Sequence, residues 1–183
     1  MRRLAAALPL LALAGCEPGE SRPTLMAPPM MATTVRHAGT VRVAASGGCE
    51  DCASGEARLS AAQLREAAVQ ALRGSALFAA VQEGPAAGPE GPPPGYDLAL
   101  HIFRVDVPVL GFDMRCTVEL GWTLSRPGAA GPVWQQAIET TQTARVGDAF
   151  AAVERVRLCW EGAVRTNLAE GIGRLARLPL PPR

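Results

Sequence analysis

Strict alternation of apolar and polar residues predicts one strand with a single buried face. Between residues 112 and 125 the apolar positions are every second residue: Met114, Cys116, Val118, Leu120, Trp122 and Leu124. Polar residues dominate the positions between them, as expected for a sheet that has one face in water. A Gly- and Pro-rich loop over 126–132 follows, and a Thr- and Gln-rich segment at 133–144 is predicted to return as the second strand of a hairpin.

Shorter apolar runs predict three further strands, at 40–45, 77–81 and 96–107. The last of these is apolar on both faces except at His101, Arg104 and Asp106, so we interpret His101 as a structural histidine. The Pro- and Gly-dense run over 84–95 cannot form regular structure and is expected to be an exposed loop.

Two helices are predicted from 3.6-residue periodicity. The first opens with a capping box, Ser60 and Gln63, carries an apolar stripe from Leu64 to Leu72, and ends at Gly74. The second is about 30 residues long, capped by Asp148 and ending before Pro179. Its apolar side is predicted to contain Phe150, Val153, Val156, Trp160, Val164, Leu168, Ile172 and Leu175.

Charged pairs at helical spacing cover the rest of this second helix. The predicted pairs are Glu154/Arg157, Glu161/Arg165 and Glu170/Arg174. Together the elements predict an α/β (α+β) fold: a two-layer sandwich with a mostly antiparallel sheet and two helices on one face. The expected single domain covers 40–178, and 179–183 form a short tail.

The N-terminus has the pattern of an export signal. Arg2 and Arg3 precede a short apolar run over 4–13, which is well below the roughly 20 residues of a spanning helix. Leu13-Ala14-Gly15-Cys16 resembles the lipobox of bacterial lipoproteins at all four positions. The resemblance implies a signal peptide over 1–15 and a diacylglyceryl-modified, acylated Cys16 as the first mature residue, which is a firm anchor.

Residue 17 is Glu, whereas Asp at this position retains enteric lipoproteins in the inner membrane. The implied location is therefore the periplasmic face of the outer membrane, or the cell membrane in a host with one membrane. Residues 16–39 contain Pro18, Pro23, Pro28 and Pro29 without hydrophobic periodicity, so we expect a lipidated N-terminus followed by a Pro-rich tether.

The composition excludes several kinds of binding and catalytic chemistry. The net charge is +1, which gives no basic field for nucleic acid. All 18 basic residues are Arg, so lysine chemistry is excluded, and the only histidines are His37 and His101. Asp113 and Glu119 have no spacing that distinguishes an acid pair from solvated charges. We expect no metal, no cofactor and no catalytic constellation.

The cysteines leave alternatives open. Besides Cys16 the chain has Cys49, Cys52, Cys116 and Cys159, and export favours disulfides. We favour Cys49–Cys52 within one loop and Cys116–Cys159 between strand and helix. One alternative is a redox Cys49-Glu50-Asp51-Cys52 motif, although the two acids would raise the pKa of its thiols. Another alternative is a zinc site that adds His37 and lacks an assigned fourth ligand.

The order of elements adds a family resemblance. A local match comprises Gly131-Pro132-Val133-Trp134, Ala149-Phe150, Arg155 and Asn167. Over most of 40–178 the chain resembles a broad group of envelope lipoproteins that includes curli-secretion lipoproteins, auxiliary lipoproteins of envelope ABC transporters and the lipopolysaccharide-assembly lipoprotein. The expected anchor, tether and compact domain, with no catalytic residue types, favour a membrane-anchored, non-enzymatic module that binds a protein or lipid partner in envelope assembly or transport. The alternative is a thiol-disulfide or other envelope enzyme that uses Cys49 and Cys52.

Overall fold

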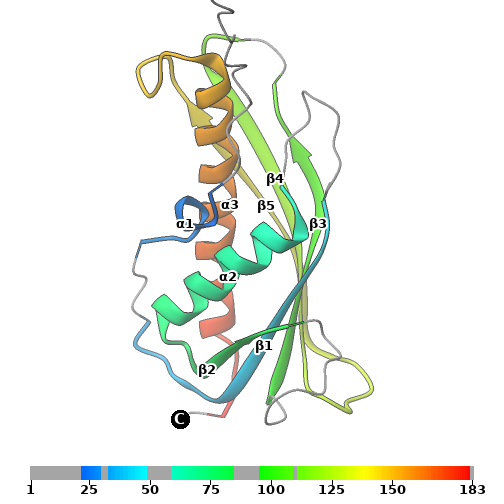
Figure 1. The fold of residues 1–183 in the computed structure, drawn as a ribbon. Helices are drawn as coiled ribbons and strands as arrows, with labels where there is room; N and C mark the ends of the chain where they lie inside the picture. The colour runs from blue at the N-terminus through cyan, green and yellow to red at the C-terminus, as the bar shows by residue number, and fades with distance from the viewer. Residues whose placement is uncertain (1–21, 30–32, 49–58, 85–94, 109–110, 182–183) are drawn as a thin grey trace, which may run out of the picture.

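The computed structural model describes residues 22–29, 33–48, 59–84, 95–108 and 111–181. These residues form a mixed α+β fold with an open five-stranded sheet and three helices (Figure 1). In chain order the elements are α1 (Pro23–Met26), β1 (His37–Gly47), α2 (Ala61–Ser75), β2 (Phe78–Glu83), β3 (Tyr96–Asp106), β4 (Met114–Ser125), β5 (Pro132–Ala144) and α3 (Ala152–Ala176).

The strand order across the sheet is β2-β1-β3-β4-β5. β3, β4 and β5 pair antiparallel, and the β4–β5 register runs from Met114 opposite Ala144 to Ser125 opposite Pro132. β1 is parallel to both of its neighbours. The longest pairings are therefore antiparallel, as expected, but β1 lies between β2 and β3 and is parallel to both, which the sequence pattern did not predict.

The alternation predicted for β4 is confirmed. All six apolar side chains from Met114 to Leu124 are buried, and the residues between them are half-buried or exposed. They join a core that also takes in residues of β1, β3, α2 and α3. Figure 1 shows α3 running along β4 and β5, which are the strands it contacts most.

β3 has a single buried face, although its sequence is apolar on both faces except at His101, Arg104 and Asp106. Leu98, Leu100 and Ile102 are buried, whereas Ala99, His101 and Phe103 are exposed. The register shifts between Ile102 and Arg104, which marks a β-bulge. One face of this strand therefore meets solvent even though its sequence is apolar on that face at Ala99 and Phe103.

The capping box predicted for the first helix is confirmed. The Gln63 backbone N–H donates to Ser60 Oγ at 3.2 Å, and the Ser60 backbone N–H donates to Gln63 Oε1 at 3.1 Å. α2 then continues through Gly74 and ends at Ser75, followed by Ala76 in the left-handed conformation with φ of 50°. Two N–H groups of its first turn are satisfied by this reciprocal bonding.

The start predicted for the last helix is wrong. α3 begins at Ala152, after the N-cap residue Ala151, which provides no side-chain cap. Asp148 closes a turn instead, since its Oδ2 accepts from the Arg145 backbone N–H at 2.6 Å. Phe150 and Val153 are exposed rather than on the buried side of the helix. The apolar period of the sequence thus extends beyond the part of α3 that packs against the core.

Part of the expected tether is also structured. Residues 23–26 form the short helix α1, and Met26 is fully buried in the core. The Arg22 backbone N–H donates to Glu161 Oε1 at 2.9 Å, and Arg165 Nε donates to the Leu25 carbonyl oxygen at 2.6 Å. For the described residues from Arg22 to Met26 the expectation of a tether without packed structure is therefore wrong, because they dock on α3.

The contact between α3 and β4 depends on a glycine. An added Cβ at Gly171 would lie 2.2 Å from Cζ2 of Trp122, a ring that is 1% exposed. Two residues further along, a Cβ at Gly173 would meet nothing closer than Arg177 Nη1 at 4.0 Å. The helix can approach the Trp122 ring closely only because residue 171 has no side chain.

We predict opposite effects for alanine at these two glycines. Gly171→Ala forces the helix and the Trp122 ring apart and should lower the free energy of unfolding by about 1–3 kcal/mol. Gly173→Ala, the matched control, should be neutral or stabilising by up to about 1 kcal/mol, because alanine is the better helix former. Denaturant unfolding followed by circular dichroism measures both, and equal stabilities of the two variants would contradict the prediction.

Candidate functional site

β5 forms one edge of the sheet and is the candidate functional site. It pairs with β4 on one side, and no other strand of the described residues pairs with it on the other side. Its buried side chains are Ile138, Thr140 and Ala144, and Trp134 is half-buried, while the others are exposed. The Thr- and Gln-rich composition of the strand therefore belongs to an edge that faces water.

An ion-pair cluster crosses the exposed face beside this edge. Arg104 Nη2 donates to Glu139 Oε2 at 2.5 Å, linking β3 to β5. The same guanidinium lies 3.3 Å from Asp106 and 3.9 Å from Glu119. The hydroxyls of Thr117 and Thr141 are 3.0 Å apart, one row further along the sheet. Glu119 is half-buried and the other charges are exposed, so the cluster favours one register of β5 without adding much stability.

α3 holds β5 from the buried side. Asn167 Nδ2 donates to the Ile138 carbonyl oxygen at 2.7 Å, and Asn167 Oδ1 accepts from Trp122 Nε1 at 3.0 Å. Thr140 Oγ1 donates to the Ala163 carbonyl oxygen at 2.8 Å. Asn167, a residue of the local family match, is thus a fully buried bridge between the helix and two strands.

Arg155, the charged residue of that match, is a structural residue too. It is buried, and its Nη1 donates to the carbonyl oxygens of Ala149 at 2.8 Å and Phe150 at 2.7 Å. The first turn of α3 thereby fixes the loop that connects it to β5. The sequence match identified both Arg155 and Asn167, but gave no indication that their side chains would be buried.

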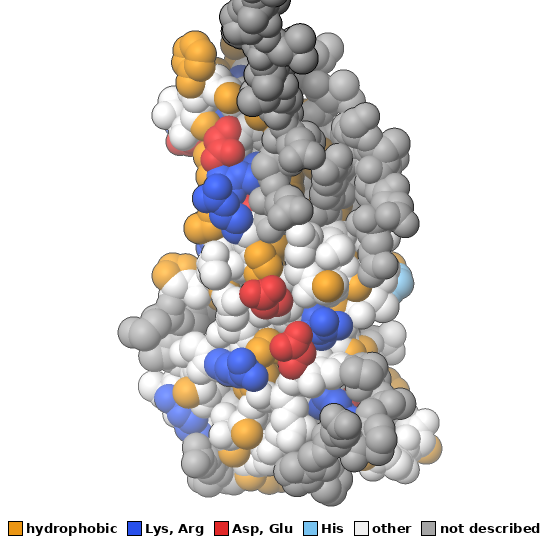
Figure 2. Space-filling model, in the orientation of Figure 1, with side chains coloured by type: hydrophobic (Ala, Val, Ile, Leu, Met, Phe, Trp, Pro, Cys, Tyr) orange, Lys and Arg blue, Asp and Glu red, His pale blue; other side chains and the backbone are white. Residues whose placement is uncertain are grey.

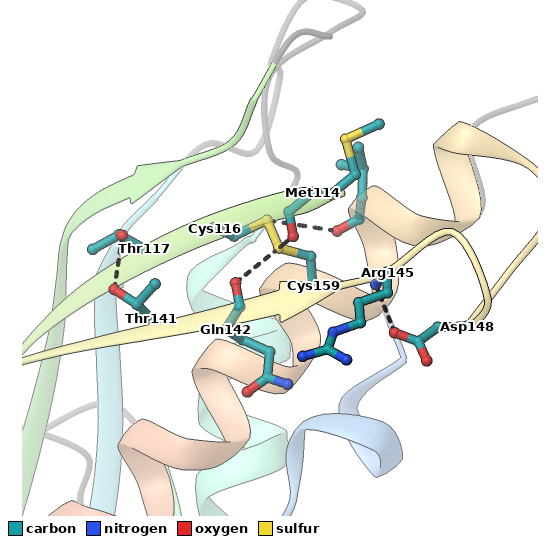
Figure 3. The surroundings of a disulfide bond; sticks show 9 residues. Met114, Cys116, Thr117, Thr141, Gln142, Arg145, Asp148 and Cys159 are labelled. Atoms are coloured by element: carbon teal, nitrogen blue, oxygen red, sulfur yellow. Dashed lines mark hydrogen bonds between the residues drawn. A yellow bond between two sulfur atoms is a disulfide. The ribbon is translucent and has the colours of Figure 1, made fainter. Parts of the chain in front are cut away.

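Cys116 and Cys159 form a disulfide between β4 and α3, with their Cα atoms 5.7 Å apart (Figure 3). Both are fully buried and lie near the end of β5 that leads to the Arg145–Asp148 turn. This covalent link joins segments 43 residues apart in the sequence. It fixes α3 to the sheet next to the candidate edge.

The two histidines have different environments. His37 is buried, its Nε2–H donates to the Leu175 carbonyl oxygen at 3.0 Å, and its ring packs 5.5 Å from that of Phe78. His101 is exposed, with Nδ1 2.9 Å from Ser46 Oγ and its ring edge-on to Phe103. Each ring thus has a hydrogen-bond partner, but His101 is exposed and its ring contacts Phe103 on the open face of β3.

The acids considered as a pair have separate partners. Asp113 Oδ1 accepts from the Val146 backbone N–H at 3.2 Å, whereas Glu119 belongs to the Arg104 cluster. Within the described ranges, no group of three or more His, Cys, Asp or Glu side chains is arranged to hold a metal ion. In the same part of the chain, none of the helices has the length and apolar character needed to cross a bilayer.

A buried ion-pair network was missed by the sequence reading, which placed Glu161 on the solvent side paired with Arg165. Glu161 is fully buried, and both of its carboxylate oxygens accept from Arg157 Nη1 at 3.0 Å. Arg157 also bonds to Glu154, and this hydrogen bond keeps the pKa of the Glu154 carboxyl below its ordinary value. The sequence feature that could have indicated this ion pair is the i, i+4 spacing from Arg157 to Glu161. Glu161 and Arg165 have the same spacing, so the spacing alone does not select the partner.

Three of the predicted site residues, Cys16, Cys49 and Cys52, lie outside the described residues. Lipidation of Cys16 and pairing of Cys49 with Cys52 therefore stay predictions, as do the redox and zinc alternatives. His37, the histidine of the zinc alternative, already has one ring nitrogen bonded to the Leu175 carbonyl.

Comparison with known proteins finds similar folds among solved bacterial structures. No protein-family model and no curated protein matches the sequence. A Xanthomonas campestris protein described by the family model DUF330 has a TM-score of 0.56 at 15% identity, covering 82% of this chain and 90% of that one. A hypothetical protein from Chlamydia trachomatis has a TM-score of 0.54 at 11% identity, covering 76% of this chain and 96% of that one.

A minor lipoprotein from Acinetobacter baumannii has a TM-score of 0.47 at 5% identity, covering 79% of this chain and 97% of that chain. At such identities the two closer similarities establish a shared α+β fold of bacterial proteins. They assign no activity and no functional residue, because a fold carries many functions.

We predict that the Cys116–Cys159 disulfide stabilises the domain more than the disulfide expected between Cys49 and Cys52. Replacing Cys116 and Cys159 together by Ala should lower the free energy of unfolding by about 2–4 kcal/mol, since the closed loop is long. The matched double change at Cys49 and Cys52 should cost less. Denaturant unfolding gives the energies and non-reducing peptide mapping gives the pairing; a peptide linking Cys116 to Cys49 would contradict the prediction.

Proposed function

We propose that this chain is a lipid-anchored lipoprotein on the periplasmic face of the outer membrane, acting as a non-enzymatic binding module in envelope assembly or transport. The observation that carries the anchor is the sequence Leu13-Ala14-Gly15-Cys16 after a basic, apolar N-terminus. Acyl chains on Cys16 would hold the protein firmly at the bilayer, since two or more chains together bind strongly.

The open edge of β5 supports the binding role. An edge strand presents backbone N–H and C=O groups that an extended segment of a partner can pair with, which is β-augmentation. The strand is held in register by β4, by the Arg104–Glu139 ion pair and by Asn167, so the edge is preorganised. The partner in this proposal is an envelope protein that offers an extended segment.

The proposal includes a two-layer sandwich, with both long helices on one face of the sheet and the other face open to solvent. The alternation of buried and accessible residues along β4 supports it, as do the contacts of α2 with β1 and β2 and of α3 with β4 and β5. The exposed face then carries the Arg104 cluster beside the β5 edge. No catalytic residue is assigned in this reading.

The anchor has a direct test. Cys16→Ser should leave an unprocessed precursor and abolish the incorporation of radiolabelled palmitate, because the lipid is attached to the Cys16 thiol. Glu17→Asp is the matched control: it should remain lipidated but fractionate with the inner membrane in an enteric host. Normal processing of Cys16→Ser to a mature chain would contradict the proposal.

The edge role is tested by proline substitution. Backbone N–H groups of adjacent strand residues point in opposite directions, so one of Thr141→Pro and Gln142→Pro removes a bond to β4 and the other removes only a free-edge donor. The variant that keeps the wild-type melting temperature is the edge variant. It should lose the partner crosslinks that wild-type protein gives in envelope extracts.

The two variants control for each other, because both introduce the same residue into the same part of β5. If the stable variant gives the wild-type crosslinks, β5 is not the binding edge, although the anchor proposal would be unaffected. Titration of free thiols in periplasmic protein addresses the enzyme alternative. Fast-alkylating Cys49 and Cys52 would support thiol-disulfide chemistry in place of an adapter role.

A further inference from the structure

One end of the molecule exposes four large apolar side chains, which we call the apolar tip. Phe150 is fully exposed, Phe112 is 85% exposed, and Val146 and Val153 are about half exposed. They lie in the β3–β4 loop, in the β5–α3 loop and in the first turn of α3. Figure 2 shows hydrophobic side chains at the upper left, over the loop between β5 and α3. Clustered exposed apolar groups of this kind mark a contact surface.

The two loops of the apolar tip are held by hydrogen bonds. Arg155 fixes the carbonyls of Ala149 and Phe150 from the buried side. Asp113, next to Phe112, accepts from the backbone N–H of Val146 and so links the two loops. The exposure of these side chains is therefore built into the fold.

The N-terminal chain determines how far this tip can be from the lipid. Arg22 is bonded to Glu161 on α3, and Cys16 lies only six residues before it. A fully extended chain of that length spans at most about 20 Å. If Cys16 carries the anchor, as in the proposed function on which this inference rests, the bilayer surface must lie within that distance of Arg22.

The two ends of α3 lie at different distances from Glu161, the residue to which Arg22 is bonded. From Glu161 to Val153 is eight residues, or about 12 Å along the helix axis, so the apolar tip is well within reach. From Glu161 to Ala176 is fifteen residues, or about 22 Å, so the opposite end lies at or beyond the limit. The link to the lipid thus favours the end at which the apolar tip lies.

We propose that the apolar tip is a second membrane contact: in the lipid-anchored protein, Phe112 and Phe150 insert into the interface of the bilayer that holds Cys16. The occupant of this surface is the lipid bilayer. Aromatic rings with apolar neighbours bind in the interfacial region of a bilayer because their apolar area is removed from water there. With two attachments, the domain stands on the membrane in one orientation, with the β4–β5 hairpin end directed away from it.

The test uses the full mature, lipidated protein in phosphatidylcholine vesicles, with and without bromine on the acyl chains. Tryptophan is introduced at the tip as Phe150→Trp or Phe112→Trp, and at the other end of β5 as Val133→Trp. Val133 is also exposed, which makes it a matched control. The wild-type emission is subtracted. The added emission at 150 and at 112 should shift to the blue and be quenched by bromine, and that at 133 should do neither.

Each other result overturns the inference in a distinguishable way. A lipidated protein, verified by mass spectrometry, with no quenching at 150 and 112 overturns the tip contact and leaves the anchor in place. A blue shift at these positions without quenching by bromine indicates burial against protein, such as a second copy of the chain. Equal quenching at 133 overturns the orientation. A chain without lipid on Cys16 overturns both this inference and the proposed anchor.

Discussion

The buried amide of Asn167 is the interaction on which the rest of the structure depends. It accepts from the indole N–H of Trp122 on β4 and donates to the carbonyl of Ile138 on β5, with no exposure to water. A buried polar group that loses its partner costs about 1–3 kcal/mol, so this bridge specifies how α3 lies on the sheet. Gly171, one turn along the helix, provides the space that the Trp122 ring needs.

A second constraint follows from the same helix. Glu161 is fully buried, and its carboxyl oxygens accept hydrogen bonds from Arg157 and from the Arg22 backbone N–H. A buried charge of this kind is tolerated only when it is paired and hydrogen-bonded. The segment that begins at Arg22 therefore contributes a hydrogen bond to α3, and Met26 is fully buried in the core. This makes α1 part of the domain, although its sequence resembles a Pro-rich linker.

The sequence predicted what depends on local pattern. The alternation along β4 and the capping box at Ser60 were read correctly because each rests on neighbours within a few residues. Features set by distant segments were missed. The parallel course of β1, the docking of α1 and the exposure of Phe150 all depend on which elements meet in space. For the candidate site, the polar character of β5 was evident, but its position at the edge followed only from the strand order.

An open edge strand can pair with the edge of another chain and so promote aggregation. The composition of β5 opposes this pairing. Its exposed side chains are largely Thr and Gln with Glu139, and Pro132 at its first position cannot donate a backbone hydrogen bond. Glu139 forms an exposed ion pair with Arg104, so the strand keeps a polar surface without the desolvation cost of a buried ion pair. Such a polar edge disfavours edge-to-edge aggregation, while its outer backbone groups have no strand partner among the described residues. In the proposed function, a partner segment would pair with these backbone groups, and the exposed Glu139 and Thr141 side chains would lie beside it.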